Sequence, residues 1–323
     1  MYTMIVIDFN SMNKTIRYVE EFRKQCNNHD LIHFMIVDNS PKEQNADFLK
    51  LEYELKKIIE IDLYKINIYI KRNCKIYYCY ANENLGYAKG NNLGARLSKI
   101  IWNDSYYIFS NNDLSLTSKF DAYIFDEIFK NNEDIAVIGP RIIGEDGKEQ
   151  SPHKRVSAFS RLIAYYWFYR WPFRWKPDYD YDGCSKYCYR VMGCFMLVKA
   201  KCFELVGGFD PKTFLFAEEQ ILSERLKKKD YKTYFYNDWT LIHEHGASIR
   251  KNDSVLKSEQ WAFDSICYYY RKYRNMSYVF MFFAKVNFIL YKLIAIFIYK
   301  LKILLKEDNT FYVIRKDKRD ERT

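Results

Sequence analysis

The chain has 323 residues, of which 49% are hydrophobic, and it contains only 11 Gly and 6 Pro. This composition excludes collagen-like, low-complexity and largely disordered proteins, and the length suffices for one large α/β domain or two smaller ones. Lys and Arg number 51 against 41 Asp and Glu, which gives a formal net charge of +10. Residues 251–323 carry 15 of these basic and 8 of these acidic side chains, so +7 of the charge lies there.

Three features bear on the compartment. Eight cysteines in a chain of this size do not form a disulfide framework, which predicts a reduced, cytoplasmic setting. The first residues lack a basic segment and a small-residue cleavage site, so we expect no signal peptide. No run of about 18 uncharged apolar residues occurs, which argues against a plain transmembrane helix.

The first 140 residues alternate between apolar, β-branched runs and amphipathic stretches. Buried strands are predicted over residues 2–9, 33–37, 75–80, 106–110 and 135–139. Helices are predicted from Asn13 through Phe22, after the loop 82–94, and over residues 119–130. The Lys/Glu-rich stretch 42–72 is expected to form a helix and a variable connection. This alternation predicts an α/β fold with a Rossmann-like, mostly parallel sheet and flanking helices.

The second half of the chain is less regular. We expect a hairpin over residues 142–150 and an aromatic-rich segment over 159–175. The predicted strands here are 189–198, 232–236 and 239–243, and the predicted helices are 218–229, 258–273 and 279–306.

Two predicted strands end in acidic turns, where open α/β sheets bind their ligands. Asp38 closes the second strand, and its carboxylate can accept the N–H of a uracil- or thymine-type base. Because Asp-Asn-Ser-Pro is also strong turn chemistry, an Asx turn is the alternative. Asp113, which follows Asn111 and Asn112, can hold a hard divalent cation with help from diphosphate oxygens, or it can cap the next helix.

Three further groups have the residue types of a binding or catalytic site. The loop from Asn84 to Gly94 is rich in Gly and Asn and enters a helix, which favours phosphate binding over an ordinary junction. Glu218 and Glu219 open a predicted helix, where one can act as a general base or both can complement the helix dipole. His243 ends a strand, and a neutral imidazole there can ligate a metal.

In this order, the motifs resemble those of family-2 glycosyltransferases with the GT-A fold, closest to bacterial polysaccharide enzymes of the rhamnosyltransferase-like type. The resemblance covers roughly residues 2–250. It rests on Asp38, Asn84-x-Gly86, Asn91-Asn92, Asn111-x-Asp113, Gly207-Gly208-Phe209-Asp210, Glu218-Glu219 and His243-x-x-Gly246-x-Ser248. Two positions depart from the family pattern: Asn111-x-Asp113 has one acid instead of two, and Glu218-Glu219-Gln220-Ile221-Leu222 replaces Glu-Asp-x-Asp-Leu.

The resemblance implies roles for individual residues. Glu219 would be the catalytic base, with Glu218 as the other candidate, and Asp113 and His243 would hold Mg2+ or Mn2+. The donor-binding residues would be Asp8, Asp38, Asn84, Gly86, Asn91, Asn111 and Asn112. Gly193, Asp210 and Ser248 would belong to the acceptor side or its loops. Residues 1–250 would form the GT-A domain, with a nucleotide-sugar half over 1–140 and an acceptor half over 141–250, followed by a basic helical tail over 251–323.

The tail is predicted to contain a basic amphipathic helix over residues 279–306. On a helical wheel, one half holds Lys285, Lys292, Lys300, Lys302 and Lys306, and the opposite face holds Phe288, Ile289, Leu293, Ile296 and Phe297. Such a helix is typical of one that lies on an anionic membrane surface, and packing against protein or in an oligomer is the alternative. We therefore expect a peripheral protein on the cytoplasmic face of the cell membrane, without a nucleic-acid partner.

Together these features predict an inverting, metal-assisted hexosyl- or deoxyhexosyltransferase. It would move a sugar from a UDP- or dTDP-linked donor to a saccharide or lipid-linked saccharide in cell-surface polysaccharide synthesis. One alternative is a catalytically silent, nucleotide-sugar-binding membrane scaffold, which the reduced number of acids would suit. The other is a sugar nucleotidyltransferase, although Asp8-Phe9-Asn10-Ser11 is not the Gly-rich basic loop that such an enzyme should carry after its first strand.

Overall fold

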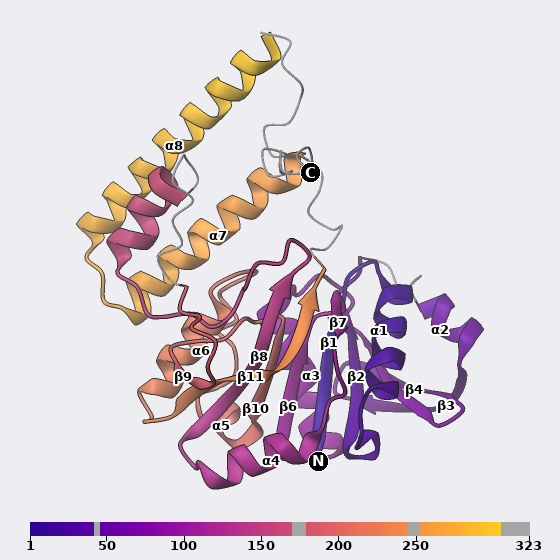
Figure 1. Cartoon of the computed structure of the whole chain (residues 1–323). Helices are drawn as coiled ribbons and strands as arrows, with labels where there is room; N and C mark the ends of the chain where they lie inside the picture. Colours follow the sequence, from indigo (N-terminus) through magenta and orange to yellow (C-terminus); the bar gives the residue numbers. More distant parts are fainter. Residues whose placement is uncertain (42–45, 170–178, 245–251, 305–323) are drawn as a thin grey trace, which may run out of the picture. The chain divides into compact units, whose positions relative to one another are not determined.

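The computed structural model describes residues 1–41, 46–169, 179–244 and 252–304 (Figure 1). The chain divides into two compact units. The first contains residues 1–155 and 178–269, and the second contains 156–177 and 270–323. The aromatic-rich segment therefore belongs to the same unit as the C-terminal residues.

A single mixed sheet forms the centre of the first unit. Its strands are β1 (Tyr2–Asp8), β2 (Ile32–Asp38), β3 (Glu54–Ile61), β4 (Tyr64–Lys71), β5 (Cys74–Tyr80), β6 (Tyr106–Ser110), β7 (Leu114–Leu116), β8 (Ile135–Gly144), β9 (Lys186–Cys188), β10 (Phe195–Lys199) and β11 (Lys232–His243). Their order is β3-β4-β5-β2-β1-β6-β10-β8-β11-β7, with β9 paired to β11. Strands β5, β2, β1 and β6 run parallel, as do β8 and β11, whereas β10 is antiparallel to both of its neighbours.

Helices cover both faces of this sheet. They are α1 (Met12–Lys24), η1 (His29–Leu31), α2 (Ala46–Glu52), α3 (Gly86–Ile101), α4 (Ala122–Asn131), α5 (Ala200–Leu205) and α6 (Glu218–Lys227). The first part of α7 (Asn252–Tyr273) belongs to the same unit, and the hydroxyl of its Tyr269 donates to Glu224 of α6. Val6 of β1 belongs to a buried cluster with residues of α1 and α4, while its neighbour Ile5 belongs to a second cluster with residues of α3, α5 and α6. Because adjacent strand residues point to opposite faces, β1 is apolar on both sides. The predicted α/β architecture with flanking helices is confirmed.

Residues 42–72 differ from the prediction. The described part forms the short helix α2 and then the hairpin β3–β4, instead of a helix and a variable connection. Isoleucines alternate along β4 and favour a strand, and the turn between β3 and β4 uses Asp62 at a φ of +53°. Strand β3 lies at the edge of the sheet, where charged side chains are common because they discourage pairing with other chains. Its Lys and Glu residues therefore gave the pattern of a surface helix.

Strand β8 also extends beyond its predicted end, because it continues through Pro140 to Gly144. Strand β10 pairs with β8 only at Val137 and Ile138, so Pro140 has no strand neighbour on that side. The missing N–H of a proline is tolerated in such a position. Likewise, residues 232–243 form one strand, β11, whose pairing is interrupted after Tyr236, instead of two separate strands.

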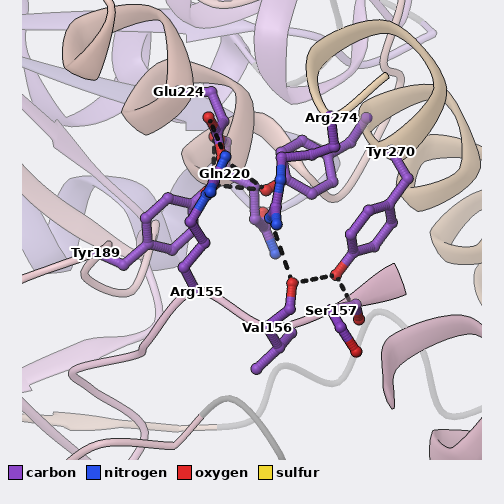
Figure 2. Close-up of polar contacts among 9 residues, drawn as sticks. Arg155, Val156, Ser157, Tyr189, Gln220, Glu224, Tyr270 and Arg274 are labelled. Atoms are coloured by element: carbon purple, nitrogen blue, oxygen red, sulfur yellow. Dashed lines mark hydrogen bonds and ion pairs between the residues drawn. The ribbon is translucent and has the colours of Figure 1, made fainter. Parts of the chain in front are cut away.

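The second unit consists of helices in its described part. The π-helix η3 (Ser160–Tyr169) packs against α8 (Tyr278–Leu304): the ring of Tyr166 lies 5.1 Å from that of Phe288 and 5.0 Å from that of Tyr291. At the end of α7, the hydroxyl of Tyr270 donates to the carbonyls of Val156 and Ser157, each at 3.2 Å (Figure 2). Phe288 was predicted to lie on the free apolar face of α8, but it is buried against η3.

Helix α8 also contains a stretch, Tyr278–Ile298, that is long and apolar enough to cross a membrane by length and composition. Its mean hydropathy is 1.9, and 17% of it is buried. The sequence argues against a plain transmembrane helix because lysines interrupt this stretch. By composition alone, Lys285 and Lys292 do not remove it from the candidates.

Candidate functional site

Asp113 and His243 lie side by side at two strand ends. Asp113 directly precedes β7, and His243, the last residue of β11, pairs with Leu114 of β7. Nε2 of His243 is 3.3 Å from Oδ1 of Asp113, and Nδ1 of His243 is 2.8 Å from Oε1 of Gln150. Because an amide oxygen can only accept, Nδ1 carries a proton in this bond. In the neutral imidazole, the lone pair of Nε2 then lies beside the carboxylate, whereas a protonated imidazole would form an ion pair with Asp113.

These two side chains fit a divalent cation. Oδ1 of Asp113 is buried and accepts no hydrogen bond within the described residues. A carboxylate oxygen and an imidazole nitrogen that are both acceptors are brought together favourably by a positive charge. In the part of the chain that the structure describes, no group of three or more His, Cys, Asp or Glu side chains could hold a metal. A cation held here would therefore take further oxygen ligands from outside this pair, as diphosphate can provide.

Glu218 and Glu219 begin α6 after a strained turn. Phe216 and Ala217 have φ values of +72° and +69°, a left-handed conformation that costs roughly 1–2 kcal/mol per L-residue. Glu218 is 3% exposed, and its Oε1 accepts no hydrogen bond from the described residues. Burial, followed by the charge of Glu219, raises the pKa of Glu218 to about 8. A raised pKa favours the protonated form of Glu218, which makes this carboxyl a poorer proton acceptor than its neighbour.

Glu219 is the better placed base of the pair. Its Oε1 accepts a hydrogen bond from the backbone N–H of Gly193 at 3.0 Å, and its side chain is only part-buried. A Cβ atom at Gly193 would collide with this carboxylate, so any larger residue would displace Glu219 from its present position. The predicted loop residue Gly193 is therefore in direct contact with the predicted base.

The segment Gly193–Cys194 joins the two acidic groups. The backbone N–H of Asn111 donates to the carbonyl of Cys194 at 2.8 Å, which places the end of β6 beside the residue that holds Glu219. Burial raises the pKa of the Cys194 thiol well above its usual range, and the carboxylates of Asp113 and Glu219 raise it further. The predicted metal ligands and the predicted base thus converge at one end of the sheet.

Helix α6 is fixed further along by an ion pair of the buried Glu224. Arg155, whose side chain is 39% exposed, donates to both oxygens of Glu224, from Nε at 2.7 Å and from a terminal nitrogen at 3.0 Å (Figure 2). The hydroxyl of Tyr189 donates to the same carboxylate at 2.9 Å. A bidentate pair of this kind restricts the helix that carries the two acids.

Tyr87 is a site residue that the sequence analysis missed. Its hydroxyl donates to the carbonyl of Gly193 at 2.6 Å, and its backbone N–H donates to the carbonyl of Phe214 at 3.0 Å. The neighbouring Gly86 has a φ of +70°, and any Cβ there would collide with the carbonyl of Phe214. Tyr87 therefore fixes Gly193, which binds Glu219, and together with Gly86 it fixes the loop around Phe214 that precedes Glu219. Its place inside the Asn84–Gly94 motif was the only sequence feature that could have revealed it.

Asp8 and Asp38, the two acids predicted to bind the donor, form hydrogen bonds with other residues of the protein. Asp38 is fully buried and accepts hydrogen bonds from the Ser40 N–H and the Tyr78 hydroxyl, both at 2.9 Å. Asp8 is also fully buried; it accepts from the hydroxyls of Ser11 and Thr15, and burial raises its pKa. The Asx-turn geometry at Asp38 is present, and its role in binding the donor base stays a prediction.

The remaining predicted residues occupy turns and helix starts. Helix α3 begins at Gly86, so most of the expected phosphate loop is helical. Within the Asn84–Gly94 motif, Asn84 accepts from the N–H of Gly86 and Asn91 donates to the carbonyl of Tyr87. Asn112 donates to the hydroxyls of Ser11 and Thr15. Asp210 accepts from the hydroxyl of Tyr268. Ser248 lies outside the described residues.

No known family profile matches this chain, and no curated protein sequence is similar to it. Among solved structures, it is similar to GalNAc-T7 with UDP, GalNAc and Mn2+, with a TM-score of 0.52 and 12% identity over 77% of this chain and 44% of that one. It is also similar to the mannosyltransferase PcManGT from Pyrobaculum calidifontis in complex with GDP-Man and Mn2+ (TM-score 0.48, 12% identity, 79% of this chain and 59% of that one). A third similar structure is S. aureus TarS (TM-score 0.45, 11% identity, 75% and 60%).

The match thus spans less than two thirds of the length of each of these proteins. At 12% identity, the likeness to GalNAc-T7 concerns the fold and not the reaction. It agrees with the strand order and with the convergence of polar side chains at the sheet end described above. The chain has the GT-A fold.

Proposed function

We propose that the protein is a glycosyltransferase that uses a nucleotide-activated sugar. The observation that carries this proposal is the convergence of Asp113, His243 and Glu219 at one end of a GT-A sheet. This arrangement combines a pair suited to a cation with a separately held carboxylate, which is what transfer from a diphosphate donor requires. The structure of similar fold, GalNAc-T7, was solved with UDP, GalNAc and Mn2+.

The proposed reaction is an inverting displacement. Glu219 would take the proton of an acceptor hydroxyl, the hydroxyl oxygen would bond to the anomeric carbon, and the bond from that carbon to the diphosphate oxygen would break. Gly193 fixes one oxygen of the Glu219 carboxylate through its N–H, which orients the other for proton transfer. Asp113 and His243 would hold Mg2+ or Mn2+, and a cation there neutralises the charge of the departing nucleoside diphosphate.

The proposed donor is a UDP- or dTDP-linked hexose or deoxyhexose. The acceptor would be a saccharide or lipid-linked saccharide in cell-surface polysaccharide synthesis. The motifs that resemble the bacterial polysaccharide enzymes support this choice, together with the acid pair of α6. The sequence at the end of β1 continues to disfavour a sugar nucleotidyltransferase.

A thermal-shift screen against nucleotide sugars tests the donor class. At 100 times its dissociation constant, a bound donor stabilises a protein by about 2.7 kcal/mol. We expect a UDP- or dTDP-sugar to raise the melting temperature, with a larger increase when Mn2+ or Mg2+ is present. The variant Asp113→Asn should lose the metal-dependent part. If no nucleotide sugar stabilises the wild type, the proposal is wrong; if donors bind but hydrolysis and transfer are undetectable, the silent scaffold is correct.

We also propose that α8 attaches the protein to an anionic membrane surface. Its apolar side chains that are more than a third exposed include Val279, Phe282, Phe283, Val286, Ile289, Leu290, Leu293, Ile296 and Phe297. At about 100° per residue they form one stripe along the helix. Lys285 and Lys292 border this stripe, contrary to the predicted arrangement in which the lysines and the apolar residues lie on opposite faces. The side of α8 opposite the stripe packs on η3 through Phe288. A helix with one free apolar side and adjacent cations suits the interface between headgroups and acyl chains.

Lying flat is favoured over crossing the membrane. A lysine near the bilayer centre costs roughly 2.5–3.5 kcal/mol, whereas a lysine at an anionic surface contributes about 1 kcal/mol. We therefore expect the full chain to sediment with liposomes that contain anionic lipid and to be released by high salt. Deletion of the residues after Asn275 should abolish sedimentation. Retention after a high-salt wash would indicate a spanning helix, and absence of sedimentation with either lipid would contradict membrane attachment.

A further inference from the structure

Two exposed aromatic side chains lie beside the loop that leads to the acid pair. Phe216 is 38% exposed and precedes Glu218 by two residues. Trp261, on the part of α7 that belongs to the first unit, is 40% exposed. No step of the proposed reaction uses either ring. Their position next to the candidate base raises the question of what they bind.

The loop and the helix form one fixed surface. The ring of Phe214 packs against that of Trp261, with centroids 5.1 Å apart. The hydroxyl of Ser265, one turn along α7 from Trp261, donates to the carbonyl of Leu215 at 2.8 Å. The N–H of Tyr87 holds the carbonyl of Phe214 from the other side. Phe214 and Trp261 are thus held together by packing and by backbone hydrogen bonds, and Phe216 follows Phe214 by two residues in the same loop.

The conformation of Phe216 is unfavourable for its residue type. A left-handed φ of +72° is rare for a bulky side chain, and glycine or asparagine would adopt it at lower cost. Phe216 nevertheless remains 38% exposed, so burial of its ring offsets only part of this strain. A strained and partly exposed aromatic residue two positions before the acid pair points to a functional role.

We propose that Phe214, Phe216 and Trp261 form an acceptor subsite that stacks a pyranose ring. This proposal rests on the proposed glycosyltransferase function and names the part of the acceptor that would be recognised. A pyranose has an apolar C–H face and a rim of hydroxyls. Aromatic rings bind the apolar C–H face of a pyranose by dispersion and weak C–H contacts. Glu219, three residues after Phe216, is the polar group that one of the rim hydroxyls would meet.

The surroundings favour a sugar over an acyl chain. Phe216 is followed within three residues by two glutamates, and Glu219 is part-buried and hydrogen-bonded to Gly193. Acyl chains avoid such polar neighbours, whereas a saccharide needs them for its hydroxyls. The subsite is therefore assigned to the sugar adjacent to the bond being formed.

Saturation-transfer NMR with methyl pyranosides tests the subsite. The probes are methyl α-L-rhamnopyranoside, methyl β-D-glucopyranoside and methyl β-D-galactopyranoside, each added to the full chain with UDP and Mn2+. We expect at least one probe to receive saturation on its ring protons. Phe216→Gly and Trp261→Ala should reduce this transfer at least fivefold, and Phe216→Tyr should retain it. Tyr123→Ala, which removes an aromatic side chain that is 58% exposed on α4, is the matched control and should change nothing.

A stability measurement separates this role from a structural one. Phe216→Gly relieves the left-handed strain but removes a ring that is more than half buried, so we expect its melting temperature to stay within about 4 °C of the wild type while sugar binding is lost. A larger fall in melting temperature together with loss of binding would mean that Phe216 is needed for folding, and would overturn the proposal. Unchanged probe binding in both variants, or no probe binding to a wild type that binds UDP, would overturn it too. A wild type that binds neither UDP nor dTDP in calorimetry would instead overturn the proposed function.

Discussion

The carboxylates near the end of the sheet fall into two groups that differ in how their oxygens are paired. Asp8 and Asp38 are fully buried, and each oxygen of Asp38 accepts a hydrogen bond from the protein. Asp113 and Glu218 each keep a buried oxygen that accepts no hydrogen bond from the described residues. Glu219 is part-buried and held by one backbone N–H.

This difference distinguishes carboxylates that stabilise the fold from carboxylates that can take part in the proposed reaction. A buried carboxylate is costly unless hydrogen bonds replace its water, so Asp8 and Asp38 are stabilised by the turns and helix starts that they hold. The second group is incomplete without something from outside: a cation beside Asp113, a proton on Glu218 and a substrate hydroxyl at Glu219. Substitutions in the two groups should therefore have different consequences, mainly for stability in the first and mainly for turnover in the second.

The largest effect is expected for Glu219→Gln. Glutamine keeps the hydrogen bond to Gly193 but cannot take a proton, so sugar transfer should fall by roughly 100-fold to 10,000-fold while donor affinity stays the same. Steady-state transfer rates together with calorimetry on UDP measure the two quantities. Glu127→Gln, an exposed acid on α4, is the control. An inactive Glu218→Gln beside an active Glu219→Gln would show that the base is Glu218.

The next largest effect concerns Glu218 and pH. Its pKa is raised from 4.5 to about 8, so the folded state holds a proton that the unfolded state releases between these values. The contribution of this proton to the free energy of unfolding is therefore fully present below about pH 4.5 and is lost as the pH rises toward 8. The loss is on the order of a few kcal/mol, at 1.36 kcal/mol per pH unit. Glu218→Gln should remove this dependence. Urea unfolding of both proteins from pH 5 to pH 9 measures it, and parallel curves would mean that Glu218 is ionised throughout.

The sequence predicted the strands around the site because their patterns are local. The apolar runs of β1 and β2 are rich in β-branched residues and those of β5 and β6 in aromatic ones, and their polar ends follow directly in the chain. The resemblance to family-2 glycosyltransferases then brought Asp113 and His243 into one predicted metal site, and these two side chains are adjacent. The acid pair at the start of α6 was found in the same way.

Contacts between distant segments could not be predicted. Nothing in the local pattern around Tyr87 indicates a hydrogen bond to Gly193, which lies 106 positions away. The same is true of the hydrogen bond that His243 donates to Gln150, 93 positions away. The hairpin β3–β4 was missed because an edge strand carries the charged residues that also mark a surface helix. The hydrogen-bond partners of Asp38 could not be predicted for a similar reason, because one of them, Tyr78, comes from a neighbouring strand.

Asp38→Ala should reduce stability more than a donor-binding role alone would require. The change leaves the Ser40 N–H and the Tyr78 hydroxyl without their acceptor, and an unsatisfied buried donor costs about 1–3 kcal/mol. We expect a loss of about 2 kcal/mol in urea unfolding, and a smaller loss for Tyr78→Phe, which removes one of the two donors. UDP affinity should also fall if Asp38 binds the base. Full stability combined with lost UDP binding would move Asp38 into the second group.

The smallest effect is expected for Tyr87→Phe, because the change removes one hydrogen bond and keeps the ring. Without its hydroxyl, the carbonyl of Gly193 loses a partner at 2.6 Å, and the N–H of Gly193 that holds Glu219 becomes less well fixed. A loosely held base reduces turnover and not donor affinity, so kcat should fall about tenfold, equivalent to about 1.4 kcal/mol, while the KM for donor stays within twofold. Tyr80→Phe, whose side chain comes from β5, is the control. A rise in donor KM with unchanged kcat would instead place Tyr87 in the donor site, and would return the Asn84–Gly94 motif to the phosphate-binding role predicted from the sequence.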